Sequence, residues 1–163
     1  MKNRQQEARV GSPAPDFMLR DGNDELWSLS GHRGKVIVLF FYPGDETPVC
    51  TRQMCSLRDR WGDYRATGAE VVGISTDSVE SHRGFAKHYN LPLRLLSDVD
   101  RKVANLYGAH SIIPGRLARS VFVIDAEGTI RYRDVRRVGL IRPKNEDVLR
   151  AIREAQSIQN RER

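Results

Sequence analysis

The longest apolar run in the chain, residues 36–42 (Val-Ile-Val-Leu-Phe-Phe-Tyr), consists of β-branched, aromatic and leucine side chains. A run without polar alternation is typical of a strand that is buried on both faces of an α/β sheet. Shorter runs of the same kind predict strands at 70–75, 93–96 and 120–125. We therefore expect a sheet in which the 36–42 strand is central.

Apolar residues at helical spacing lie between these strands. Within 48–64 they recur at intervals of four and three residues, which places them on one face of a single helix: Cys50, Met54, Leu57, Trp61 and Tyr64. Similar patterns predict helices over 79–89 and 102–107. Strands and helices therefore alternate along the middle of the chain.

Two antiparallel pairs are predicted outside this alternating region. A turn cluster at 21–24 joins the apolar segments 17–19 and 26–29 into an N-terminal β-hairpin. A tight turn at 126–128 leads from the 120–125 strand to an antiparallel partner at 129–133.

A closing helix begins near Asn145, whose side chain is suited to cap it, and its buried face is Val148, Leu149 and Ile152. The order of elements predicts a mixed central sheet that is flanked by helices, in a thioredoxin-type α/β fold. The 163 residues, 39% of them apolar, suffice for one core. We therefore predict a single domain over residues 1–163, of which residues 1–10 are mobile.

Composition and charge exclude several classes of protein. No apolar run approaches the roughly 20 residues of a membrane span, so we expect no membrane partner. The first ten residues lack the apolar segment of a secretory signal, and we expect a cytoplasmic protein. The net charge is +6, but the basic stretch at 131–142 lacks the series of aromatic side chains that base stacking needs. We interpret it as a solvated face and expect no nucleic-acid partner.

The candidate chemistry follows the 36–42 strand, because ligands of open α/β sheets bind beyond the carboxyl ends of strands. Thr47 is suited to be an N-cap and Pro48 the first helical residue, so Cys50 falls in the first turn. Free N–H groups and the positive end of the helix dipole favour a thiolate there, which is the nucleophilic form. We expect Cys50 to be reactive rather than an inert core residue.

Cys55 follows Cys50 by five residues. In a helix this spacing gives a rise of about 7.5 Å and a rotation of about 140°, so the two Cα atoms are roughly 8.5 Å apart. A disulfide tolerates no more than about 7 Å without backbone movement. A bond between these cysteines therefore requires local unwinding of the helix; the alternative is an inert thiol beside Met54.

These residues carry a resemblance to a known family. Pro43, Thr47 and Cys50 match the Pro-x-x-x-Thr-x-x-Cys motif of the peroxiredoxins. The string at 41–51, with a second cysteine at Cys55, resembles the Q-type branch, also called bacterioferritin comigratory proteins. The similarity extends through the segments 11–17, 72–75 and 119–125 and thins after Gly139.

The resemblance implies a thiol-dependent peroxidase that reduces hydrogen peroxide and organic hydroperoxides. Cys50 would attack the peroxide and become a sulfenic acid. Cys55 would resolve it to an intramolecular disulfide, which a thioredoxin-like reductant would reduce. The resemblance also implies no cofactor, no metal, and a monomer or weak dimer.

Three further residues occupy positions to which the family assigns a role. Thr47 and Arg119 would hold the peroxide and the sulfur, and the physical reason is that positioned donors stabilise the charge that O–O cleavage creates. Arg116 is a nearby alternative to Arg119. Pro43 would shape the loop and shield the sulfur, because its φ angle is fixed.

Two positions depart from the family's pattern. Val49 stands where many Q-type sequences have glycine, which alters access to Cys50. The loop between Tyr107 and Arg119 is short, which bears on substrate range and on subunit contacts.

Two other functions fit the sequence less well. A protein disulfide oxidoreductase shares this fold, but its Cys-x-x-Cys hallmark is replaced here by Cys-x4-Cys. A zinc or nucleic-acid module would use the cysteines with His32, His82, His88 or His110, whose spacing does not match structural zinc sites. We interpret these histidines as surface residues.

Overall fold

The computed structural model describes residues 8–138 and 143–161, apart from the side chain of Gln159. The predicted mobility of residues 1–10 concerns mainly residues 1–7, which lie outside the described ranges, as does Arg142 of the basic stretch. Among the described residues, no helix is both long and apolar enough to cross a membrane.

Seven strands form one mixed sheet in the spatial order β2-β1-β5-β4-β3-β6-β7. β3, β4 and β5 are parallel, whereas β1, β2, β6 and β7 pair with their neighbours in antiparallel fashion. The predicted central strand is β3, which lies between β4 and β6. The strands are β1 (Met18–Asp21), β2 (Leu26–Ser28), β3 (Ile37–Phe41), β4 (Glu70–Ser75), β5 (Arg94–Ser97), β6 (Arg119–Ile124) and β7 (Ile130–Arg136).

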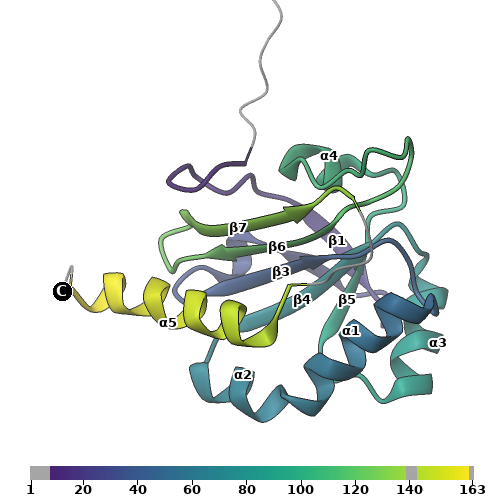
Figure 1. Ribbon diagram of the computed structural model, residues 1–163, viewed down its shortest axis with the longest axis horizontal. Helices are drawn as coiled ribbons and strands as arrows, with labels where there is room; N and C mark the ends of the chain where they lie inside the picture. The colour runs from purple at the N-terminus through teal and green to yellow at the C-terminus, as the bar shows by residue number, and fades with distance from the viewer. Residues whose placement is uncertain (1–7, 139–142, 162–163) are drawn as a thin grey trace, which may run out of the picture.

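Helices cover both faces of the sheet, as predicted (Figure 1). Alternate residues of β3 point to opposite faces, so Val38 and Phe40 pack in one core cluster and Leu39 and Phe41 in the other. The first cluster is covered by α1 (Pro48–Asp59), α2 (Trp61–Thr67), α3 (Val79–Tyr89) and α5 (Asn145–Arg161). The second is covered by α4 (Lys102–Tyr107) and by the N-terminal segment with its short 3-10 helix, Ser30–His32.

The prediction of a single helix over 48–64 is wrong, because Arg60 separates α1 from α2 with φ −102° and ψ 12°. Hydrogen bonds join α2 and the Arg60 junction to α5. The Tyr64 hydroxyl donates to Asn145 at 2.8 Å, and the Arg60 guanidinium contacts Glu146 at 2.7 Å. Tertiary contacts therefore override a continuous helical pattern.

The prediction that Asn145 caps the last helix is also wrong. Asn145 is the first residue of α5, and the carbonyl of Lys144 accepts from the N–H groups of Asp147 and Val148. The Asn145 amide instead donates to Ser56 at 2.8 Å while its oxygen accepts from Tyr64. The side chain therefore joins α5 to α1 and α2.

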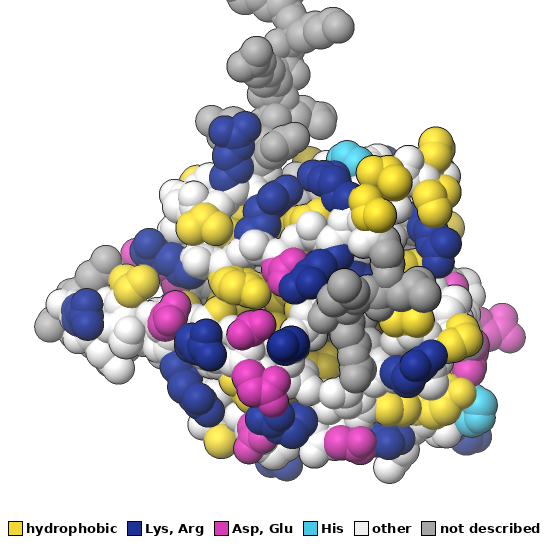
Figure 2. All heavy atoms as spheres, in the orientation of Figure 1, with side chains coloured by type: hydrophobic (Ala, Val, Ile, Leu, Met, Phe, Trp, Pro, Cys, Tyr) yellow, Lys and Arg dark blue, Asp and Glu magenta, His cyan; other side chains and the backbone are white. Residues whose placement is uncertain are grey.

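The basic stretch is partly neutralised. Arg131 pairs with Asp125 at 2.7 Å and Arg136 with Asp134 at 2.8 Å. On the face drawn in Figure 2, lysine and arginine side chains are interspersed with acidic ones. The absence of a nucleic-acid partner stays a prediction.

Candidate active site

Cys50 lies in the first turn of α1 and is fully buried. Thr47 is at the predicted N-cap position, with extended backbone angles (φ −73°, ψ 146°), and Pro48 is the first helical residue. The Thr47 hydroxyl does not cap a helical N–H but donates to the carbonyl of Gly44 at 3.0 Å. The first-turn N–H groups are therefore not satisfied by this side chain.

Arg119 contacts the sulfur of Cys50. β6 pairs with β3 so that Ser120 lies opposite Phe41, which places Arg119 just beyond the carboxyl end of β3. Its Nη1 donates to Cys50 Sγ at 2.8 Å, and the side chain is only 4% exposed. A guanidinium at this distance forms a charge-assisted hydrogen bond with a thiolate.

The Nε of Arg119 is buried and has no hydrogen-bond partner among the residues that the structure describes. Buried donors are almost always paired, so an unpaired one beside a reactive atom is available to a ligand. Arg116, the alternative named from the sequence, is exposed. The structure therefore brings Arg119, and not Arg116, to the sulfur.

A cavity of about 230 Å³ lies beside Arg119. Its lining includes Pro43 and Arg119, together with Ile112, Ile113 and Arg116 of the loop that precedes β6. The two isoleucines are 67% and 52% exposed, so the mouth of the cavity is apolar with arginines around it. This arrangement leaves room for a small, partly apolar molecule beside Arg119.

Cys55 is also in α1, half-buried, and both cysteines are free thiols. Because Cys50 and Cys55 belong to the same continuous helix, the Cα separation of roughly 8.5 Å expected from helix geometry applies. Cys55 lines a separate groove of about 880 Å³, together with Gln53 and Asn145. Both polar atoms of the Gln53 amide are buried without a hydrogen-bond partner in the described part of the chain.

Comparison with known proteins identifies the family. Residues 10–133 match the AhpC/TSA family. The chain belongs to this family. Peroxiredoxin Q of wheat (Triticum aestivum), a chloroplastic protein, is 47% identical over 123 residues, which cover 75% of this chain and 57% of that protein. The chain thus spans little more than half the length of that relative.

A bacterial relative and a solved structure agree with this family. The putative peroxiredoxin bcp of Coxiella burnetii is 42% identical over 128 residues, covering 74% of this chain and 84% of that protein. The crystal structure of peroxidoxin BcpB from Mycobacterium tuberculosis superimposes with a TM-score of 0.78 at 28% identity, covering 93% of this chain and 99% of that chain. The predicted resemblance to Q-type peroxiredoxins and the thioredoxin-type fold are confirmed.

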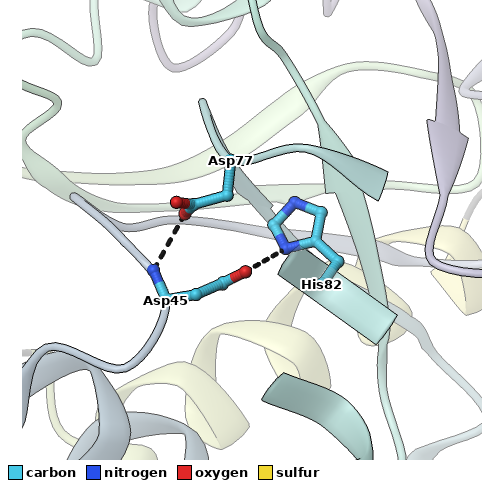
Figure 3. A group of neighbouring side chains, drawn as sticks. All are labelled: Asp45, Asp77 and His82. Carbon is cyan, nitrogen blue, oxygen red and sulfur yellow. Dashed lines mark hydrogen bonds and ion pairs between the residues drawn. The ribbon is translucent and has the colours of Figure 1, made fainter. Parts of the chain in front are cut away.

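In this AhpC/TSA family member, a second polar cluster lies beside the loop that leads to Cys50 (Figure 3). The backbone N–H of Asp45 donates to Asp77 at 2.8 Å, and the Asp45 carboxylate accepts from His82 Nδ1 at 2.8 Å. His82 is fully buried, so its interpretation as a surface residue is wrong. Its position on the face of α3 that also carries the buried Phe85 was the signal in the sequence.

The other histidines differ in exposure. His88 and His110 are exposed, as predicted, whereas His32 is half-buried and stacks on Trp27 with ring centroids 4.6 Å apart. None of these three joins the cluster around Asp45.

The cluster has the residue types of a metal site, since ligand atoms of Asp45, Asp77 and His82 lie within 4.8 Å of one another. However, both ring nitrogens of His82 face oxygen acceptors, Asp45 at 2.8 Å and the Leu96 carbonyl at 3.0 Å. Both ring nitrogens are thus already in contact with oxygen atoms of the protein. The geometry is that of a hydrogen-bond network.

Tyr42 completes the cluster by donating its hydroxyl to Asp45 at 2.6 Å. Burial raises the pKa of Tyr42 well above its ordinary value of 10.0, and the negative charge of Asp45 raises it further. The phenol therefore stays protonated and remains a donor at physiological pH.

Proposed function

We propose that this protein is a thiol-dependent peroxidase in which Cys50 reduces hydrogen peroxide and organic hydroperoxides. The observation that carries the proposal is the 2.8 Å contact between the buried Arg119 guanidinium and Cys50 Sγ in the first turn of α1. Membership of the AhpC/TSA family supports it. A sulfur without exposed surface suits a small peroxide better than a protein disulfide.

In the first step, the Cys50 thiolate attacks one peroxide oxygen and the O–O bond breaks. The sulfur gains a hydroxyl group and becomes a sulfenic acid, while the other oxygen leaves with the bonding electron pair and takes up a proton to become water or an alcohol. Arg119 keeps its proton throughout, so its role is electrostatic. Its unpaired Nε is a donor for the oxygen on which charge develops.

Thr47 and Pro43 complete the proposed site. A hydroxyl donates one hydrogen bond and accepts two, so Thr47 can accept from the peroxide O–H while it donates to Gly44. Pro43 lines the cavity with Arg119 and has no N–H, so it shields the sulfur without competing for the substrate. Both roles act on orientation and not on proton transfer.

In the second step, the Cys55 thiolate attacks the sulfur of the sulfenic acid and displaces hydroxide, which leaves as water. The intramolecular disulfide requires α1 to unwind between the two cysteines. A thioredoxin-like dithiol then reduces the bond by thiol–disulfide exchange. Cys55 is the more exposed of the two cysteines, which favours its sulfur as the atom that the reductant attacks.

Cell location and assembly are part of the same proposal. A thiol pair that must be reduced in every cycle works in a reducing compartment, so we place the protein in the cytoplasm. Cys50, Cys55, Thr47 and Arg119 come from one chain, so a monomer or weak dimer suffices for the reaction.

The Cys55→Ser variant tests the two-cysteine scheme. It is expected to consume one equivalent of hydrogen peroxide per chain and to stall with a sulfenic acid at Cys50, whereas Cys50→Ser consumes none. Peroxide consumption is followed with and without thioredoxin and its reductase. Full thioredoxin-driven turnover by Cys55→Ser would contradict resolution by Cys55.

A further inference from the structure

The loop between β3 and α1 is fixed through the carboxylate of Asp45. This residue precedes Thr47 by two positions, and its side chain is only 2% exposed. One carboxylate oxygen accepts from the Tyr42 hydroxyl at 2.6 Å. The other accepts from the Ser81 hydroxyl and from His82 Nδ1, both at 2.8 Å. Three donors of the protein itself therefore hold the carboxylate.

His82 extends this connection from the loop to β5. It belongs to α3, is fully buried, and uses its second nitrogen to contact the carbonyl of Leu96 in β5 at 3.0 Å. The backbone N–H of Asp45 separately donates to Asp77, which follows β4. The loop is thus tied to α3, to Asp77 in the segment after β4, and through His82 to β5.

The backbone of the same loop adopts an uncommon conformation. Glu46, between Asp45 and Thr47, has φ +61°, in the left-handed region that side chains other than glycine rarely adopt. Such conformations persist where the surroundings over-determine them, and they occur at functional sites. Here Asp45 holds the residue on one side, and the bond from Thr47 to Gly44 holds it on the other.

We propose that the buried Asp45–His82 pair is a positioning device for the peroxide reaction, which sets the place of Thr47 relative to Cys50. This inference rests on the proposed peroxidase function. The hydrogen bonds and ion pairs of the described residues link neither Asp45 nor His82 to Cys50 or Arg119, so both act through the loop. The pair is separate from the contact that stabilises the thiolate, and the two contributions can be measured separately.

Two substitutions of His82 test the proposal against each other. His82→Asn places an amide N–H near the position of Nδ1 and keeps the bond to Asp45, while it loses the bond to Leu96. His82→Gln places its amide near Nε2 and keeps the Leu96 bond, while it loses the bond to Asp45. Both variants bury one side-chain amide, and they differ only in which of the two hydrogen bonds is kept.

The measured quantity is the second-order rate constant for oxidation of Cys50 by hydrogen peroxide in a single turnover. Misplacement by about 1 Å costs on the order of a hundredfold in rate, so we expect His82→Gln to lose about tenfold to a hundredfold and His82→Asn clearly less. The rate of Cys50 alkylation by iodoacetamide is expected to be unchanged in both, because the contact with Arg119 is intact. Equal losses in the two variants, or a parallel loss of alkylation, would overturn the proposal.

An exposed histidine of the same helix supplies the matched control. His88 contacts Glu46 at 3.1 Å, and its side chain is exposed. His88→Gln is expected to leave the peroxide rate unchanged, and a loss equal to that of His82→Gln would count against a specific role for the buried pair.

A milder variant keeps the test valid if a His82 variant does not fold. Ser81→Ala removes one donor to the Asp45 carboxylate, and its expected effect is a loss of about twofold to tenfold in the peroxide rate with unchanged alkylation. An unchanged peroxide rate overturns the positioning role. A wild-type protein that does not react with peroxide at all contradicts the proposed function instead, so the two failures are distinguishable.

Discussion

The two segments that flank Cys50 treat their buried polar groups in opposite ways. On the N-terminal side, the Asp45 carboxylate accepts hydrogen bonds from three side chains, and the loop is tied to α3, to the segment after β4 and, through His82, to β5. On the C-terminal side, the Gln53 amide is buried, and neither of its polar atoms is paired with another described residue. The loop before Cys50 is therefore held by several hydrogen bonds. The helix after Cys50 buries an unpaired amide, which local unfolding would expose to water.

This difference matches the two steps of the proposed reaction. Attack on the peroxide needs a fixed geometry around Cys50, which the Asp45 network supplies. Resolution needs α1 to open between Cys50 and Cys55. An unpaired buried amide destabilises the folded state by about 1–3 kcal/mol. Because unwinding exposes this amide to water, the free energy needed to unwind α1 is lower by a similar amount.

The largest expected effect is on the reaction of Cys50 with peroxide. Arg119→Met removes the donor to Cys50 Sγ and is expected to lower the second-order rate with hydrogen peroxide by about 10²–10³-fold, the loss typical of removing one donor to developing charge. Stopped-flow oxidation or competition for peroxide measures the rate. Arg150→Met, at an exposed position of α5, controls for the loss of one positive charge. A similar rate in both variants would contradict the assignment of Arg119.

The second effect is on the unwinding of α1 between Cys50 and Cys55. Gln53→Met keeps the volume of the side chain and removes the unpaired amide, so the reduced helix becomes more stable and the sulfenic acid lives longer. We expect disulfide formation to slow by about tenfold, within the range that about 1–3 kcal/mol permits, while the first step is unchanged.

The longer-lived sulfenic acid gives a direct readout, since excess peroxide converts it to a sulfinic acid that intact mass detects. Gln156→Met is the control, because the Gln156 amide already donates to the carbonyl of Thr67. Equal rates of disulfide formation in wild type and Gln53→Met would show that the amide does not influence opening.

The smallest effect tests the network at one contact. Tyr42→Phe removes one of the three donors to Asp45 and keeps the ring, so the peroxide rate is expected to fall by about twofold to tenfold. Because burial and Asp45 raise the pKa of Tyr42 well above 10.0, the phenol keeps its proton, and the ratio of wild-type to variant rates is expected to be constant from about pH 6 to pH 9. A ratio that falls toward one as the pH rises over this range would contradict the role of Tyr42 as a donor.

Local patterns in the sequence predicted much of this site. Thr47, Pro48 and Cys50 occupy the predicted positions at the start of α1, because capping preferences act over a few residues. The order of strands and helices was predicted for the same reason, since buried strands and amphipathic helices differ in period.

Contacts between distant segments were not predictable in this way. Asp45 and His82 are 37 residues apart, and only the pairing of β3, β4 and β5 brings them together. The choice between Arg116 and Arg119 likewise depended on the register of β6 against β3. Gln53 had a local signal, because it lies three residues after Cys50 and next to Met54 on the apolar face of α1.

The central claim is that Cys50 reacts with peroxide and Cys55 resolves the product within one chain. The most direct test mixes the reduced protein with one equivalent of hydrogen peroxide and follows free thiols and intact mass over seconds. The account predicts rapid loss of both thiols and a mass lower by two hydrogens. Survival of both thiols at unchanged mass would contradict it.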